Sequence, residues 1–358
     1  MSTNTQHYPA SLSQQIYDLP ALILNARLAD ALERGIARYP IHRSLRFAAR
    51  TSINAVFDDL AANLDLTAQR PGSCNLILDG EGLFVEAHAG HKADYCSFHF
   101  GIWADSIARV EGLIQAIETR VAQVRIDEAM FSIDWHFLGG RGELQSTSIE
   151  ELADDELHDE AYPEIGDVAG FIDRYLRAKE TVLVLQGRPG TGKTRLIRAI
   201  LGEMSRRNGG CAQALYTGDK KALECDAIYV KFITGDDHAF VVEDADHLLR
   251  PRAEGNEHLH RFLAIADGVV RAQGRKIIFS TNLPNVGDLD DALVRPGRCF
   301  AHVHVRELTL AEAQTLVAPL AADRGVNAAE VMGVLAASGN RSHSLAQIYQ
   351  AVDRASSN

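Results

Sequence analysis

Residues 187–194 read Gly-Arg-Pro-Gly-Thr-Gly-Lys-Thr and fill every fixed position of the pattern G-x4-G-K-[S/T]. They follow a strand-like apolar run and precede a helical stretch, which is the context that this pattern requires. Glycines let backbone N–H groups wrap around phosphate oxygens, and the start of a helix favours negative charge. Lys193 is therefore predicted to reach the β- and γ-phosphates of ATP, and the Thr194 hydroxyl to be a Mg²⁺ ligand. The predicted ATP-binding residues of this loop are Gly187, Pro189, Gly190, Thr191, Gly192, Lys193 and Thr194.

Two adjacent carboxylates, Glu243 and Asp244, end the apolar run that begins at Ala239. In a fold built around a phosphate loop, one such acid lies near Mg²⁺ and the next lies near the attacking water. The order of the two acids at the end of the run predicts that Glu243 supports the metal together with Thr194, and that Asp244 polarises the water. The usual order is Asp followed by Glu, so the reversed order places the shorter side chain at the water.

Three further polar residues complete the predicted catalytic set. Asn282 ends the apolar run 277–281, where its amide can lie beside the γ-phosphate and the water. Arg295 and Arg298 flank a Pro-Gly corner. Guanidinium groups suit phosphate oxygens, and a second subunit can insert one in trans. The predicted catalytic residues are Glu243, Asp244, Asn282, Arg295 and Arg298.

The second part of the chain alternates strands with helical stretches, which predicts a parallel sheet with helices on both faces. The predicted strands are 181–186, 212–216, 239–243, 276–280 and 301–305. Helical patterns alone follow, at about 309–321, 327–337 and 342–355. The predicted fold is an α/β P-loop NTPase core, residues 161–306, with a C-terminal helical lid, residues 307–358.

Residues 1–160 are predicted to form a separate small α+β domain. The predicted helices are 21–37, 45–64 and 107–124, and the predicted strands are 75–78, 83–88, 95–103, 130–138 and 143–148. Acidic residues fill most of the segment from Glu150 to Glu160, which is typical of a solvated linker. A metal site at His88, His91 and His99 is disfavoured, because no carboxylate or cysteine completes the set at a spacing typical of metal ligands.

The composition is that of an ordinary globular protein, with 358 residues, 46% hydrophobic and 23% charged. The net charge is −12, and the whole excess of acid lies in residues 1–160, which argues against a large nonspecific DNA-binding surface. Five scattered cysteines without a CxxC pair argue against a disulfide scaffold or a zinc ribbon. We expect a cytoplasmic protein with no membrane span, since no apolar run reaches roughly 18 residues and the polar start lacks a signal-peptide pattern.

Residues from about 162 to 305 resemble an AAA+ ATPase module of the AAA clade, and the likeness extends loosely over the lid to residue 356. The phosphate loop, the acid pair, Asn282 as sensor 1 and the arginine corner occur in the order of the family. The run 243–246, together with 263–269, is most similar to the mitochondrial translocase of the Rieske iron–sulfur protein and its bacterial and phage relatives.

This resemblance implies a homo-oligomeric ring, a hexamer or a heptamer, with ATP at each subunit boundary. Arg295 and Arg298 would face the nucleotide of the neighbouring subunit. Ile165 lies where relatives contact adenine. Arg341, at the start of the last predicted helix, is a sensor-2 candidate, and an ordinary surface arginine is the alternative.

The sequence leaves three functions open. The first is a ring that remodels or translocates a protein client chosen by the N-terminal domain. The second is a nucleic-acid-associated ATPase, such as a loader or a phage or defence NTPase, which Lys220 and Lys221 favour and the acidic N-terminal part opposes. The third is a ring that only switches shape on ATP binding, which the reversed acid pair keeps open. Residues 217–222 lack the aromatic–aliphatic–Gly pore loop of many AAA unfoldases, which argues against aromatic threading.

Overall fold

The computed structural model describes residues 19–34, 39–140, 142–153, 157–251, 258–266, 274–295 and 297–356. The chain divides into two compact units, Met1–Met130 and Phe131–Asn358. This division falls well before the predicted boundary at residue 160. The reason is that a hairpin, made of β7 (Met130–Leu138) and β8 (Leu144–Leu152), joins the sheet of the second unit rather than that of the first.

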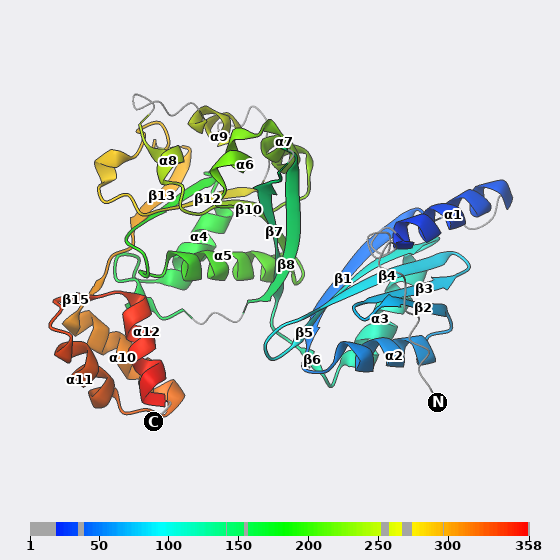
Figure 1. The fold of residues 1–358 in the computed structure, drawn as a ribbon, viewed down its shortest axis with the longest axis horizontal. Helices are drawn as coiled ribbons and strands as arrows, with labels where there is room; N and C mark the ends of the chain where they lie inside the picture. The colour runs from blue at the N-terminus through cyan, green and yellow to red at the C-terminus, as the bar shows by residue number, and fades with distance from the viewer. Residues whose placement is uncertain are drawn as a thin grey trace. The chain divides into compact units, whose positions relative to one another are not determined.

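The first unit is built on a six-stranded sheet with the order β2-β3-β4-β5-β1-β6, in which all neighbours are antiparallel. Its strands are β1 (Ile41–Ala49), β2 (Thr67–Gly72), β3 (Asn75–Gly80), β4 (Leu83–His91), β5 (Cys96–Ala104) and β6 (Arg125–Ile126). Helices α2 (Ile53–Asn63) and α3 (Ile107–Val121) cover one face (Figure 1). The core between them includes Phe47 stacked on Phe98, with ring centroids 5.1 Å apart.

The segment 45–64, predicted as one helix, is a strand followed by a helix, so the first half of that prediction is wrong. β1 pairs with β5 along its whole length. α2 begins only after Ser52, whose side chain accepts a hydrogen bond from the backbone N–H of Ala55. β2 was not predicted at all.

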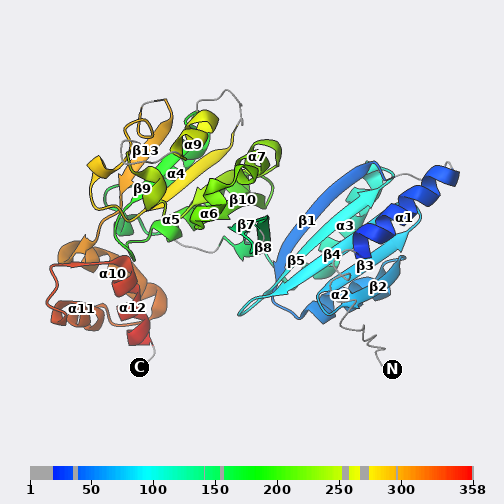
Figure 2. The same ribbon diagram turned by 45° about the horizontal axis from the view of Figure 1, so that its top comes forward.

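The first predicted helix corresponds to α1 (Leu19–Arg34), and its residues 35–37 lie outside the described part of the chain. α1 lies across the sheet face opposite α2 and α3 (Figure 2). There Arg27 donates hydrogen bonds of 2.9 and 2.6 Å to the buried carboxylate of Asp79. This charged pair ties the helix to β3.

The second unit contains a seven-stranded sheet with the order β13-β9-β12-β11-β10-β7-β8. Its parallel part consists of β9 (Val182–Gln186), β10 (Cys211–Thr217), β11 (Ala239–Val242), β12 (Lys276–Thr281) and β13 (Cys299–His304). Its helices are α4 (Val168–Arg177), α5 (Lys193–Arg207), α6 (Lys220–Glu224), α7 (Asp226–Thr234), α8 (Asp246–Leu249) and α9 (Leu259–Ala266). Every residue of β9, β11 and β12 is buried, as a parallel sheet covered on both faces requires. The predicted α/β core is confirmed.

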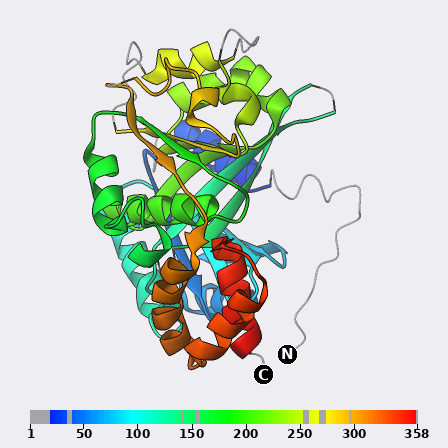
Figure 3. The same ribbon diagram turned by 90° about the vertical axis from the view of Figure 1, so that its left-hand side faces the viewer.

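The C-terminal lid consists of α10 (Leu310–Arg324), α11 (Ala328–Ala337) and α12 (Leu345–Ser356), which pack against one another (Figure 3). α10 begins with a capping box in which Thr309 and Glu312 satisfy each other's backbone N–H groups. Two short strands, β14 (Leu308–Thr309) and β15 (Ser342–His343), pair at the base of the lid. None of the described helices, in the lid or elsewhere, is long and apolar enough to cross a membrane.

Candidate functional site

The loop 187–194 connects β9 to α5, as predicted. Gly190 and Gly192 adopt positive φ angles of 79° and 101°, which glycine reaches without strain. A Cβ atom on Gly187 would lie 2.0 Å from the carbonyl oxygen of Val305, so no larger residue fits there. The first N–H groups of α5 have no partner within the helix, which makes this helix start suitable for a phosphate.

Lys193 is buried and donates to three oxygens around the loop. Its Nζ lies 2.6 Å from the carbonyl oxygen of Gly187, 3.0 Å from that of Arg188 and 2.9 Å from Oδ1 of Asn282. Burial lowers the pKa of Lys193, while the carboxylates of Asp244, Glu243 and Asp246 act in the opposite direction. The ammonium group is thus held beside the acid pair.

Thr194 and Glu243, the two predicted magnesium ligands, meet directly. The Thr194 hydroxyl donates to Oε1 of Glu243 at 2.6 Å. The hydroxyl of Tyr216, at the end of β10, donates to Oε2 of the same carboxylate at 2.8 Å. Hydroxyl and carboxylate oxygens are the donors that Mg²⁺ prefers, and Mg²⁺ commonly takes only one or two protein ligands beside a nucleotide. The residues present therefore fit this ion.

Asp244 is the one described non-glycine residue with a positive φ, 50°. Its backbone N–H donates to Oγ of Ser280 at 3.3 Å, and its carboxylate accepts from Nδ2 of Asn282 at 2.8 Å. Asn282 therefore bridges Lys193 and Asp244, with its oxygen toward the lysine and its nitrogen toward the acid. The structure brings the predicted sensor and the predicted water-polarising acid into contact.

Asp246 is a supporting residue that sequence reasoning did not assign. Its Oδ1 accepts from the Thr281 hydroxyl at 2.6 Å and from the backbone N–H of Asn282 at 2.8 Å. It fixes the end of β12 and thereby the position of Asn282. The signal was present in the sequence as a third acid, two residues after Asp244.

A cavity of about 500 Å³ surrounds these groups and is closed on one side by the lid. Its lining residues from the lid are Leu345, Ala346 and Tyr349, which the sequence did not indicate. The backbone N–H of Ala346 donates to the carbonyl oxygen of Gly190 at 3.0 Å. The guanidinium group of Arg195 stacks over Tyr349, 4.3 Å from the ring centroid. The start of α12 is thus bonded to the phosphate loop itself.

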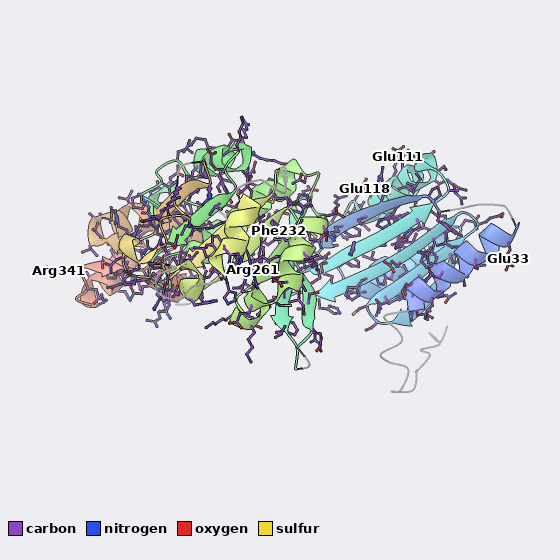
Figure 4. All side chains as sticks on the ribbon, turned by 90° about the horizontal axis from the view of Figure 1, so that it is seen from above. Glu33, Glu111, Glu118, Phe232, Arg261 and Arg341 are labelled. Atoms are coloured by element: carbon purple, nitrogen blue, oxygen red, sulfur yellow. The ribbon has the colours of Figure 1, made fainter. Side chains whose placement is uncertain are left out.

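Six predicted site residues, all within the described part of the chain, do not line this cavity: Gly187 and Thr191 of the phosphate loop, and Ile165, Arg295, Arg298 and Arg341. Arg341 is exposed in the lid (Figure 4). Arg295 is exposed, Arg298 is half-buried and donates to the carbonyl oxygen of Ala292 at 3.0 Å, and the proline between them lies outside the described residues. The backbone N–H of Ile165 donates to the carbonyl oxygen of Tyr162.

Two of the histidines considered above, His88 and His99, lie on neighbouring strands of the first unit. His88 and His99 lie opposite one another on β4 and β5, and burial lowers the pKa of His99 to about 4. In the part of the chain that the structure describes, no group of three or more His, Cys, Asp or Glu side chains could hold a metal ion.

Comparison with known proteins assigns the core. Residues 183–307 match the model of the ATPase family associated with various cellular activities, AAA. The chain contains an AAA ATPase domain. Domains of this family hydrolyse ATP and use Mg²⁺, so the predicted enzymatic class and cofactors are confirmed for this domain.

Three similar proteins match parts of this chain. An ATP-dependent zinc metalloprotease FtsH from Ralstonia pickettii is 28% identical over 222 residues, 57% of this chain and 29% of the relative. The human peroxisomal ATPase PEX6 is 24% identical over 294 residues, 78% of this chain and 28% of the relative. An AAA-ATPase from Arabidopsis thaliana is 32% identical over 162 residues, 41% of this chain and 34% of the relative. The chain therefore spans about a third or less of the length of these relatives.

The AAA domain defined in this way begins after the hairpin of β7 and β8. The strands β9 to β13 lie within the matched residues except for Val182, the first residue of β9, and the hairpin adds two strands beyond β10 at the edge of the same sheet. This addition carries Trp135, whose ring meets that of Tyr216 edge-on at a centroid distance of 5.9 Å. The hairpin therefore reaches a residue of the candidate site.

Proposed function

We propose that the chain is a subunit of a homo-oligomeric ring, a hexamer or a heptamer, that uses ATP hydrolysis to remodel or translocate a protein client. The observation that supports the ring is the division of the predicted site. Lys193, Glu243 and Asp244 lie together at one cavity, whereas Arg295 and Arg298 do not line it. We therefore propose that Arg295 and Arg298 complete the site of a neighbouring subunit, as arginines supplied in trans do in related phosphoryl-transfer enzymes.

Within this proposal each residue has a role. Lys193 binds the β- and γ-phosphates, and Thr194 with Glu243 holds Mg²⁺, which neutralises phosphate charge when bound. Asp244 accepts the proton of the attacking water, which Asn282 helps to orient. Ile165 contacts adenine, and Arg341 is the sensor-2 candidate.

A protein client is favoured by the relatives. FtsH is by its name an ATP-dependent zinc metalloprotease, and a protease acts on a protein. The first unit lies outside the AAA domain, and we propose that it selects the client. The narrower likeness to the Rieske-protein translocase group rests on residues 243–246 and 263–269, and the cytoplasm is the proposed location.

The second candidate is a nucleic-acid-associated ATPase, including a loader or a phage or defence NTPase. One observation favours it: Lys220 and Lys221 are both exposed at the start of α6, directly after β10. The acidic first part of the chain disfavours it. A ring that only switches shape on ATP binding is the third candidate.

The test is a hydrolysis-blocked ring, Asp244→Asn, loaded with ATP and used to capture bound material. The Lys193→Ala chain, which should not load ATP, is the matched control. Enrichment of protein that depends on ATP loading supports the first proposal, and enrichment of nuclease-sensitive nucleic acid supports the second. Failure of the ATP-loaded Asp244→Asn chain to assemble above a monomer, measured by light scattering, contradicts the ring.

A further inference from the structure

Tyr216 donates a hydrogen bond from its side chain to the carboxylate of Glu243, although neither the phosphate-loop pattern nor the predicted site includes it. We propose that Tyr216 is a positioning residue for Glu243 and that Trp135, from the added hairpin, holds Tyr216 in place. This inference rests on the proposed role of Glu243 as the acid on the magnesium side.

The first argument is the geometry of the carboxylate. Its two oxygens accept from two different hydroxyl groups, Thr194 at 2.6 Å and Tyr216 at 2.8 Å. A glutamate has one more rotatable bond than an aspartate, so the reversed acid order places the more flexible side chain beside the metal. Two donors on opposite oxygens remove that freedom before Mg²⁺ arrives, and the tyrosine supplies the donor that lies outside the phosphate loop.

The second argument concerns the division of labour between the two acids. The hydroxyl groups of Thr194 and Tyr216 each occupy one lone pair on a different oxygen of Glu243, so they fix the orientation of this carboxylate and leave lone pairs for a metal ion. The carboxylate of Asp244 accepts from the side chain of Asn282 and is exposed to the cavity, where a water can approach it. Tyr216 therefore supports the metal-side orientation of Glu243, and Asp244 is left as the acid open to water.

The third argument is that the phenol remains a donor. The tyrosine hydroxyl lies 2.8 Å from Oε2 of Glu243, and an ionised carboxylate offers acceptor oxygens only, so the phenol is the donor in this contact.

The fourth argument links the tyrosine to the hairpin. Trp135 on β7 packs edge-on against the tyrosine ring, with an angle of 87° between the planes. Two hydrogen bonds join β7 to the residues that follow the tyrosine: Thr217 Oγ1 to the carbonyl oxygen of His136, and the backbone N–H of Leu138 to Oδ2 of Asp219, each 2.9 Å. The hairpin and the end of β10 thus form one connected support for the metal-side acid.

The experiment is a Mg²⁺ titration of ATP-analogue binding, followed by fluorescence of a labelled nucleotide, in the full chain. For Tyr216→Phe we expect unchanged nucleotide affinity in EDTA and an increase of about ten-fold in the Mg²⁺ concentration at half-maximal binding. That factor is the loss typical of a hydrogen bond to a charged group. Tyr229→Phe is the matched control, because that hydroxyl donates to the carbonyl oxygen of Leu223 in the core, and its Mg²⁺ midpoint should equal that of the parent.

A second pair of variants tests the hairpin. Trp135→Ala should shift the Mg²⁺ midpoint in the same direction by about three-fold, while Phe137→Ala, an exposed aromatic on the same strand, should not. Midpoints of Tyr216→Phe and Trp135→Ala equal to that of the parent would overturn the inference and leave the ATPase assignment intact. If instead the parent binds nucleotide with no response to Mg²⁺, the proposed roles of Thr194 and Glu243 are themselves wrong.

Discussion

Asp244→Asn isolates the charge of the water-side acid with little change of shape. Asp244 adopts a φ of 50°, a left-handed conformation that asparagine tolerates and that costs other residues about 1–2 kcal/mol. The amide oxygen of the new residue can still accept from Nδ2 of Asn282, now at 2.8 Å from the carboxylate. Alanine would change both the backbone preference and this contact, so asparagine is the cleaner substitution.

The expected loss follows from the chemistry of a general base, which contributes typically about 10²–10⁴-fold to a rate. Asp244 is exposed and one methylene shorter than the usual glutamate, so we expect its contribution to lie at the lower end of this range. We expect kcat for ATP hydrolysis to fall about 100-fold, equivalent to about 2.7 kcal/mol on the barrier. Binding of ATP should be unchanged, since Lys193 and the loop are untouched.

The assay is steady-state phosphate release at saturating ATP and Mg²⁺, with nucleotide affinity measured separately. Asp323→Asn, an exposed carboxylate on α10, controls for the change of net charge. A rate for Asp244→Asn within three-fold of the parent would refute the reasoning, because the base would then be another group or the water would be oriented by Asn282 alone.

Three further results are expected. Lys193→Ala should abolish nucleotide binding measured by calorimetry, since no other predicted site residue brings a positive charge to this cavity, and retained affinity would contradict the site. Arg298→Ala mixed with Lys193→Ala should recover part of the ATPase activity that each lacks alone, because the first keeps its phosphate loop and the second can lend an arginine; mixed rings without recovery would exclude arginines acting in trans. Asp237 is 2% exposed and burial raises its pKa from 3.8 to about 6. The folded state therefore carries the cost of a buried charge above pH 6 and loses that cost below pH 4. Asp237→Asn should raise the free energy of unfolding, measured by urea denaturation, more at pH 8 than at pH 4, by up to about 3 kcal/mol; an equal gain at both pH values would contradict this.

The core of the AAA domain could be predicted because its signals are local. The phosphate loop, the acid pair and Asn282 each follow an apolar strand directly, and parallel strands bring their carboxyl ends to one edge of the sheet. The phosphate loop, the acid pair and Asn282 are far apart in the sequence, and they lie together at this edge of the sheet as predicted.

The errors arose where pairing is not local. β1 reads as helix from its own residues, since Ala48 and Ala49 continue toward α2, and its partner β5 is about fifty residues away. The strands β7 and β8 were predicted, but not the sheet they join, because a strand's sequence specifies which face it buries rather than which edge it meets. The contacts of Tyr216 and Tyr349 could not be predicted from the sequence either, because each joins two elements that become neighbours only in the folded protein.

The hydrogen bond from Ala346 to Gly190 has a thermodynamic consequence. The carbonyl group of Gly190 belongs to the phosphate loop and also accepts a hydrogen bond from the lid. The conformation of the loop and the position of the lid are therefore coupled. Linkage between two such sites is reciprocal. If nucleotide binding changes the affinity of the lid for a partner by some factor, then that partner must change the affinity for nucleotide by the same factor. A subunit that docks on its neighbour's lid would thereby sense occupancy of the site without touching the nucleotide.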